Sequence, residues 1–206
     1  MIIKEVKTTA KKTFAPGLYD LTELQRDANK RFGYSAKETL NIMQRLYESH
    51  KVLTYPRTDS RYITTDVADT LKERLKACSV GPYRKLAGSL SMRPIRKNAS
   101  FVDNKKVTDH HAIIPTEQFV DLQAMTNEER KVYDLVVRRF LAVLLPAFEY
   151  DQTVFTGELA GESFTAKGKI VKSQAGKKPM KILKRMKNGK KRTIWQRHRK
   201  NRRCRP

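Results

Sequence analysis

The sequence predicts an α+β fold: a mainly helical, winged-helix-like domain with β segments on either side of it, followed by a disordered basic tail. Three observations support this prediction. Apolar residues recur at helical spacing behind capping residues, short β-type segments lie before and after that stretch, and the C-terminal residues carry no acidic side chain. We therefore divide the chain into residues 1–17, 18–148, 149–172 and 173–206.

The first predicted elements are a strand and a capped helix. Residues 2–6 are typical of a strand and run into a connector rich in Lys and Thr. Asp20 is suited to cap a helix with Glu23 three residues on, and Gly33 is placed where that helix should end. The apolar residues at helical spacing between the two ends are Leu24, Ala28 and Phe32.

A second helix is predicted directly after this turn. Ser35 and Glu38 have the spacing of a capping box, and the helix should run to Glu48. The residues expected on its buried face are Ala36, Leu40, Met43 and Tyr47. Helix, short Gly-containing turn, helix and a strand at residues 52–55 together give the outline of a helix-turn-helix with a wing.

The remaining elements follow from spacing and turn residues. One further short amphipathic helix is predicted through Val67, Leu71 and Leu75, and residues 81–103 should be a loop with short elements. Thr126 with Glu129 opens the last clear helix, which is apolar on most sides and should be buried until Pro146 ends it. Residues 153–159 and 163–170 then read as a β-hairpin.

Composition bounds the class of protein. The net charge is +23, but residues 173–206 hold 15 of the 44 Lys and Arg and none of the 21 Asp and Glu, so the first 172 residues carry 29 minus 21, or +8. A moderately basic folded part is typical of a protein that follows a phosphate backbone. The basic tail cannot pack a core, which favours a disordered arm that binds phosphates.

Membrane and disulfide-rich classes are not expected. The longest apolar run, residues 140–145, is far short of the ~20 residues of a membrane helix, and the N-terminus lacks the apolar region of a signal peptide. We therefore expect a cytoplasmic protein without a membrane partner. Cys78 and Cys204 are too few for a disulfide scaffold or a four-cysteine zinc site.

Tyr55 is the first candidate functional residue. Because a residue before proline is pushed into an extended conformation, Tyr55 is expected on a strand, where Arg57 and Asp59 share its face. A phenol with a pKa near ~10 is a weak nucleophile until charge near it is neutralised, and a guanidinium fits two phosphate oxygens. These residues favour phosphoryl transfer to Tyr55; the alternative is a core tyrosine with Arg57 paired to Asp59 at the surface.

Three segments carry a resemblance to a known family. Residues 44–48 read Gln-Arg-Leu-Tyr-Glu, and residues 53–60 read Leu-Thr-Tyr-Pro-Arg-Thr-Asp-Ser. Together they closely resemble the active-site signature of type IA DNA topoisomerases. Residues 107–116, Val-Thr-Asp-His-His-Ala-Ile-Ile-Pro-Thr, resemble the second landmark of that family. The likeness covers residues 18–171 and is greater to the topoisomerase III branch.

The resemblance implies an activity and a role for each motif residue. Tyr55 would attack a phosphodiester of single-stranded DNA and form a 5′-phosphotyrosine, which is reversed without ATP after strand passage, relaxing supercoils or decatenating DNA. Arg57 would stabilise the scissile phosphate, and His110 would bind that phosphate or assist proton movement. Gln44 and Glu48 would position DNA, although a solvated helix face is the alternative for Gln44. The remaining candidates for DNA contact or local support are Thr54, Thr58, Asp59, Ser60 and His111.

The resemblance also implies parts that this sequence lacks. In the family, an N-terminal Toprim domain supplies the acidic cluster that binds Mg²⁺, and no such cluster is present here. We therefore expect a fragment that binds no metal itself, is inactive alone, and has single-stranded DNA and a separate Toprim domain as partners. Residues 18–148 would be the tyrosine-bearing domain, with residues 1–17 and 149–172 belonging to the β-rich arch domain.

Two alternatives remain open. Family members usually continue with an acidic stretch where this chain becomes basic, so the tail after Ser173 or Gln174 is either a phosphate-binding arm or an out-of-frame product. For the whole chain, the alternative to a topoisomerase segment is a winged-helix-like nucleic-acid-binding module in which Tyr55 is only structural.

Overall fold

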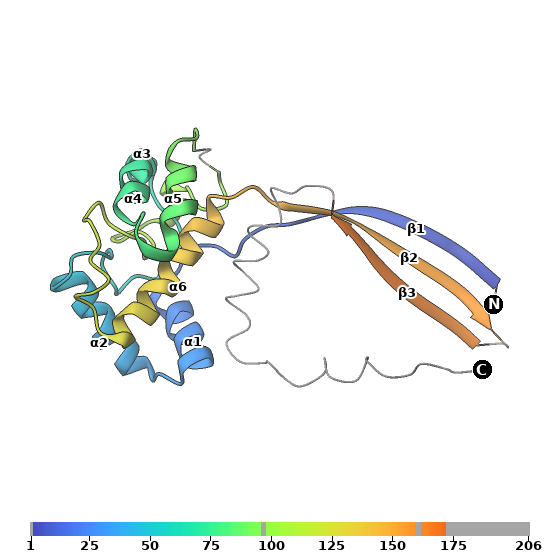
Figure 1. The fold of residues 1–206 in the computed structure, drawn as a ribbon, viewed down its shortest axis with the longest axis horizontal. Helices are drawn as coiled ribbons and strands as arrows, with labels where there is room; N and C mark the ends of the chain where they lie inside the picture. The colour runs from blue at the N-terminus through green and yellow to red at the C-terminus, as the bar shows by residue number, and fades with distance from the viewer. Residues whose placement is uncertain (1, 96–97, 160–161, 172–206) are drawn as a thin grey trace, which may run out of the picture.

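The computed structural model describes residues 2–95, 98–159 and 162–171. These residues form a block of helices from which a long three-stranded antiparallel sheet projects (Figure 1). The elements, in chain order, are β1 Ile2–Thr13, α1 Leu21–Phe32, α2 Ala36–Glu48, α3 Thr65–Asp69, α4 Leu71–Ala77, α5 Arg84–Ser91, α6 Asn127–Val143, β2 Phe148–Leu159 and β3 Glu162–Val171. The predicted α+β class is confirmed, whereas the predicted disorder of residues 173–206 lies outside the described residues.

The sheet joins the two ends of the described chain. Its strand order is β1-β2-β3, and β1 pairs antiparallel with β2 from Thr13 opposite Phe148 to Ile2 opposite Glu158. The predicted hairpin is confirmed as β2 and β3. The first strand is longer than predicted, since the expected connector after Val6 pairs with β2 as well.

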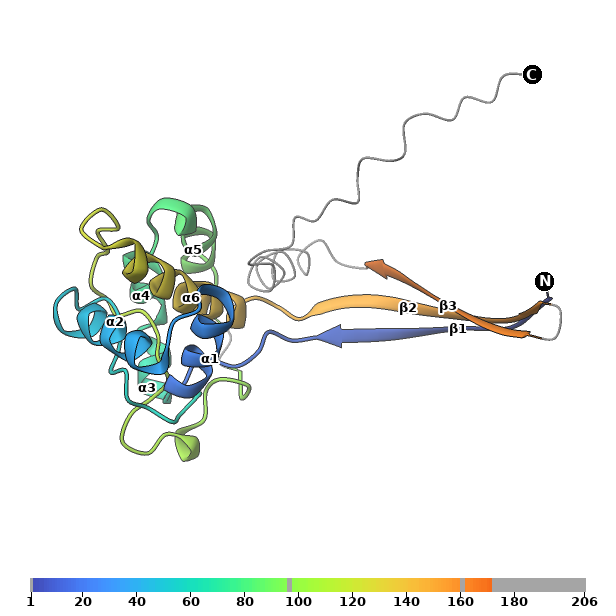
Figure 2. The same cartoon turned by 90° about the horizontal axis from the view of Figure 1, so that it is seen from below.

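The two outer strands of the sheet are exposed to solvent. Every residue of β1 is exposed, and almost every residue of β3 is exposed too. Figure 2 shows the sheet extending away from the helices, and none of the described helices lies over either face. The sheet is therefore held by its backbone ladder and by contacts between strands, such as the 2.8 Å ion pair between Lys12 and Glu149.

The helix ends follow the predicted caps. The carboxylate of Asp20 accepts the backbone N–H of Glu23 at 2.6 Å, and Gly33 ends α1 at φ 76°, a left-handed conformation that glycine adopts readily. Ser35 forms the predicted capping box at the start of α2, and Thr126 forms the one at the start of α6.

Two predictions about the helices are wrong. The buried face of α2 is only partly the predicted one: Met43 is buried as predicted, but the other buried residues are Thr39, Ile42 and Leu46. Ala36 and Tyr47 are exposed, because α2 packs on α1 and α6 with a face turned by one position. The single helix predicted through Leu71 is two helices, since the chain breaks at Thr70 between α3 and α4.

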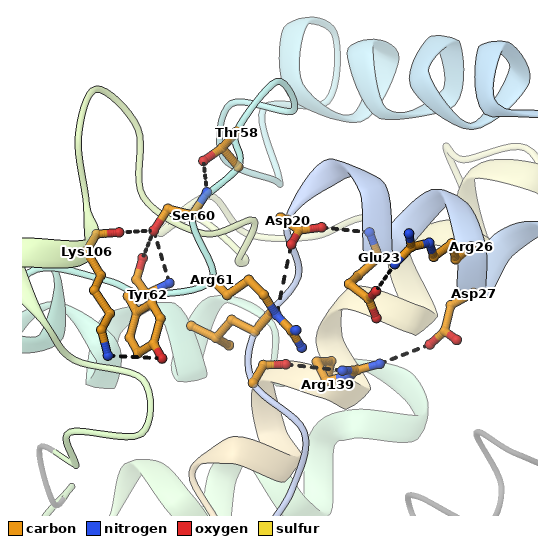
Figure 3. A network of polar contacts seen from close by, with 12 residues as sticks. Asp20, Glu23, Arg26, Asp27, Thr58, Ser60, Arg61, Tyr62, Lys106 and Arg139 are labelled. Atoms are coloured by element: carbon orange, nitrogen blue, oxygen red, sulfur yellow. Dashed lines mark hydrogen bonds and ion pairs between the residues drawn. The ribbon is translucent and has the colours of Figure 1, made fainter.

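A polar network fixes the segment by which the chain enters the helical block (Figure 3). Arg139 of α6, nearly fully buried, donates to the carbonyl of Gly17 at 3.1 Å and to the carboxylate of Asp27 at 3.0 Å. Its guanidinium also lies 4.1 Å from the ring centroid of Tyr19, whose hydroxyl donates to the same carboxylate. Asp27 thus holds α1, α6 and the entry segment together.

A cavity of about 620 Å³ lies where the sheet meets the helical block. Its walls come from the two connections to the sheet and from the chain after α5, and include Phe14, Leu90, Phe101 and Leu145. None of its lining residues belongs to the sequence motifs, so the candidate site lies elsewhere. Among the described residues, no helix is both long and apolar enough to cross a membrane.

Candidate active site

The segments around Tyr55 and His110 run side by side in the structure. The N–H of Thr54 donates to the carbonyl of Ile114 at 3.0 Å, and the N–H of Thr116 donates to the carbonyl of Val52 at 3.1 Å. Only an isolated bridge at Leu53 and Pro115 is formed, so the strand predicted at residues 52–55 is wrong: the segment is extended but has no regular ladder. Tyr55 lies just beyond this bridge and is half-buried.

The turn before Tyr55 has an unusual backbone. Lys51, two residues after the cap of α2, has φ 56°, which is uncommon for a residue other than glycine. The hydroxyl of Thr116 donates to the carbonyl of Lys51 at 2.6 Å and so supports this conformation. The left-handed residue reverses the chain and directs the following segment toward the second motif.

Thr54 joins the two segments through its side chain. Its hydroxyl donates to the carbonyl of Ala112 at 3.2 Å and accepts the N–H of Ile114 at 3.0 Å. The segment around Ile113 is also bonded on its other side, because its N–H donates to the carbonyl of Tyr19 at 2.8 Å. Thr54 therefore acts as a support that places Tyr55 relative to the second motif.

Three rings meet at Tyr55. The imidazole of His110 lies 4.2 Å from the Tyr55 ring, centroid to centroid, with the planes inclined by 36°. The ring of Tyr47 meets Tyr55 at 5.6 Å and 83°, an edge-on contact. The structure thus brings together two residues predicted for the site, Tyr55 and His110, and adds Tyr47, which was predicted for the core.

Thr58 and Ser60 are buried rather than open to a ligand. The hydroxyl of Thr58 donates to the carbonyl of His110 at 3.0 Å and accepts the N–H of Ser60 at 3.1 Å. The hydroxyl of Ser60 donates to the carbonyl of Lys106 at 2.8 Å, as Figure 3 shows. Of the two roles considered for these residues, local support is the one that their contacts fit.

Arg57 and Asp59 are exposed, on either side of buried Thr58. Among the described residues, neither forms an ion pair or side-chain hydrogen bond, so the surface pair between them considered above is not formed. The guanidinium of Arg57 is therefore available to bind an anion.

His111 contacts its own backbone segment. Its Nδ1 atom lies 2.8 Å from the carbonyl oxygen of Ala112, and the ring is half-buried. Burial lowers the pKa of His111, and the nearby charges of Arg74 and His110 act in the same direction, whereas the bond to Ala112 and the carboxylate of Asp66 oppose them. A neutral, backbone-bonded imidazole is a support of the second motif.

Arg74 of α4 is an anchor that the sequence did not indicate. Its side chain is nearly fully buried and donates to the carbonyl of Pro115 at 2.9 Å, to the hydroxyl of Thr70 at 2.8 Å and to the carboxylate of Glu117 at 2.7 Å. Burial lowers its pKa, which Glu117 opposes. Nothing in the local sequence distinguishes Arg74 from a surface helix residue.

Gln44 and Glu48 lie on α2 at positions i and i+4, with Tyr47 between them on the same face of the helix. Gln44 is half-buried and Glu48 is exposed. Because Tyr47 contacts Tyr55, this helix face is the one turned toward the site. Tyr47 could have been found from the sequence, since it belongs to the same motif as Gln44 and Glu48.

The described residues do not provide a metal site: no group of three or more His, Cys, Asp or Glu side chains is arranged to hold an ion. The donor set therefore does not fit the Mg²⁺ that the family resemblance implies. What the site offers instead is a phenol held between two rings, with an exposed guanidinium two residues further on. This arrangement suits a tyrosine acting on an anionic ester.

The fold of this chain is shared with a solved topoisomerase. It superposes on full-length Topoisomerase I from Thermotoga maritima with a TM-score of 0.64 at 24% identity, over 87% of this chain and 29% of that one. A profile of DNA topoisomerases matches residues 1–203, and the chain belongs to that family. The resemblance to the type IA enzymes is thereby confirmed.

The curated relatives identify the branch. The chain is 65% identical over 169 residues to DNA topoisomerase 3 of Bacillus anthracis, covering 82% of this chain and 23% of that protein. It is 56% identical over 176 residues to DNA topoisomerase 3 of Bacillus subtilis (strain 168), covering 85% and 24%. The chain thus spans about a quarter of the length of these relatives.

Proposed function

We propose that this chain carries the nucleophile of a type IA topoisomerase reaction. The hydroxyl oxygen of Tyr55 attacks a phosphodiester of single-stranded DNA, the bond to the 3′ oxygen breaks, and a 5′-phosphotyrosine and a free 3′ hydroxyl result. The free 3′ hydroxyl later attacks the phosphotyrosine, which restores the DNA phosphodiester and the phenol of Tyr55. Because one phosphodiester is exchanged for another, no ATP is needed. The observation that carries this proposal is the contact of Tyr55 with His110, with an exposed Arg57 two residues further along the chain.

The other predicted site residues take supporting parts in this proposal. Arg57 binds the scissile phosphate and neutralises the charge that develops on it. His110 binds the same phosphate or moves the proton between Tyr55 and the leaving hydroxyl. Gln44, Glu48 and Asp59 contact DNA. The hydroxyls of Thr54, Thr58 and Ser60 and the ring of His111 instead hold the backbone of the two motifs in place.

The proposal includes partners beyond the described residues. The ligands of Mg²⁺ would come from a Toprim domain. Residues 1–17 and 149–172 would belong to an arch domain, and residues 18–148 would be the tyrosine-bearing domain with a winged-helix-like α1–α2 pair. We place the reaction in the cytoplasm. A binding module without catalysis is not favoured, because it leaves the family match unexplained.

The test is covalent capture of DNA. The chain is incubated with 3′-labelled single-stranded DNA and Mg²⁺, alone and with the Toprim domain of a Bacillus DNA topoisomerase 3, and then denatured. We expect label on the protein when the Toprim domain is present, and none with Tyr55→Phe, although DNA binding persists.

Tyr62→Phe is the matched control, since it removes the hydroxyl of another half-buried tyrosine near the site. Capture by Tyr55→Phe would refute the assignment of the nucleophile. Label on the chain without the Toprim domain would refute the need for a partner.

A further inference from the structure

The orientation of Tyr55 depends on ring contacts. Within the described part of the chain, its hydroxyl has no hydrogen-bond partner, and the aromatic neighbours of its ring are His110 and Tyr47. His110 comes from a loop, whereas Tyr47 comes from a regular helix, one residue before the last position of α2. Tyr47 is thus the contact whose own position is set by secondary structure.

Tyr47 does not contribute to the core. It is 37% exposed, although its neighbour Leu46 is fully buried against the rest of the block. The large aromatic side chain of Tyr47 thus lies at the surface of a packed helix, where its ring contacts Tyr55. Edge-on contacts between rings have a preferred geometry, so Tyr47 restricts the tilt of the Tyr55 ring.

The end of α2 that carries Tyr47 is fastened to α6. Glu129, 3% exposed, accepts the Nε–H of Arg45 at 2.7 Å and lies 3.2 Å from Nε2 of His50. Arg45 precedes Tyr47 by two residues, and His50 follows it by three. The same carboxylate closes the capping box of α6 by accepting the N–H of Thr126 at 2.9 Å. One buried carboxylate therefore holds the chain on both sides of Tyr47.

We propose that Tyr47 is a positioning residue for Tyr55, and that Glu129 sets the place of Tyr47 through Arg45 and His50. The catalytic consequence rests on the function proposed above, whereas the structural link does not. Small displacements of a nucleophile reduce the rate strongly. The link thus runs from the start of α6, through the end of α2, to the phenol.

The first experiment measures capture at saturating DNA with the Toprim domain present. We expect Tyr47→Leu to lower the rate about tenfold with little change in DNA affinity, because the ring contact is lost. Tyr47→Phe keeps the ring and should stay within about twofold of the wild type. Glu129→Gln should lower the rate by about threefold or more, whereas Glu128→Gln, the same change at the exposed neighbour, should not.

A double variant separates positioning from general loss of structure. If Glu129 acts through Tyr47, Glu129→Gln has no further effect in the Tyr47→Leu background, so the two changes are not additive. Equal losses from Glu129→Gln in both backgrounds would overturn the link. If Glu129→Gln fails to fold, as judged by circular dichroism, Arg45→Gln replaces it, since Arg45 is half exposed.

A second measurement is independent of catalysis. In the chain labelled with ¹³C in the tyrosine rings, the Tyr55 signals are assigned as those missing from Tyr55→Phe. We expect Glu129→Gln, but not Glu128→Gln, to shift and broaden them, although Glu129 does not touch Tyr55. Unchanged Tyr55 signals would overturn the inference. If capture fails for every variant but the Tyr55 signals change as expected, only the proposed function is lost.

Discussion

The imidazole of His110 lies against the ring of Tyr55, with 4.2 Å between centroids and 36° between planes. In this tilted contact, a phosphate bound beside the phenol can accept a ring N–H of His110. The backbone carbonyl of His110 is held by Thr58, so the ring is presented from a fixed point.

His110→Phe tests whether stacking alone is sufficient. The phenylalanine ring can stack but cannot donate or accept a proton, so we expect covalent capture to fall by about 10²-fold while single-stranded DNA binding remains measurable. His110→Gln, which keeps a donor, should lose less. If His110→Phe captures DNA at the wild-type rate, the role of His110 is to position Tyr55 only.

Thr54→Val removes the hydroxyl that joins the two motif segments. The N–H of Ile114 loses its acceptor inside the protein, and we expect the free energy of unfolding to fall by about 1–3 kcal/mol. Thr54→Ser keeps both hydrogen bonds and should cost less. Urea unfolding of the two variants checks this, and a smaller loss for Thr54→Val than for Thr54→Ser would show that the methyl group contributes more than the hydroxyl.

Glu129 should make stability depend on acid. Burial alone would raise its pKa, but hydrogen bonds from Arg45, the N–H of Thr126 and His50 outweigh this and lower the pKa from 4.5 to about 2. As the pH falls, the unfolded chain therefore binds a proton at this carboxylate at a higher pH than the folded chain does. The stabilisation, on the order of 3 kcal/mol, is complete above about pH 4.5 and is lost as the pH falls toward 2.

Urea unfolding of the wild type and of Glu129→Gln between pH 3 and pH 7 measures this effect. The difference in free energy between the two proteins should shrink as the pH falls below about 4.5. Glu128→Gln, at an exposed position on the same helical turn, should show little difference from the wild type at any pH. A difference between wild type and Glu129→Gln that does not change with pH would contradict the assignment.

Asp27→Asn should weaken the helical block. It removes the charge opposite Arg139, whose side chain is only 7% exposed, and leaves a buried guanidinium without its counter-ion. We expect a loss of about 3 kcal/mol in the free energy of unfolding. Asp59→Asn, at an exposed position, is the control and should be nearly neutral. A small effect of Asp27→Asn would mean that water solvates the guanidinium of Arg139 once the carboxylate is removed.

Local signals were enough to predict where three of the helices begin. The caps at Asp20, Ser35 and Thr126 depend on residues three apart, so spacing alone identifies them. The buried face of α2 was wrong because the patterns starting at Ala36 and at Thr39 both have helical spacing, and packing on α6 decides between them. The extension of β1 was missed because its partner strand follows more than 130 residues later.

The site shows the same division. The motifs predicted Tyr55, Arg57 and His110 as site residues, because their order along the chain is characteristic. Neither Arg74 nor Glu129 could be found in this way, since each acts on residues about 40 or 80 positions away. The local sequence around a charged helix residue does not indicate which distant carbonyl or guanidinium its side chain contacts.

The exposed sheet has a consequence for local motion. Since β1 buries no side chain, its backbone hydrogen bonds are protected mainly by the neighbouring strand, whereas Leu24, Leu46 and Val136 lie in a closed core. Opening of β1 therefore needs far less free energy than opening of the helices. Amide hydrogens of residues 2–13 should exchange with solvent through separation of β1 from β2, while Tyr55 and its neighbours keep their native arrangement.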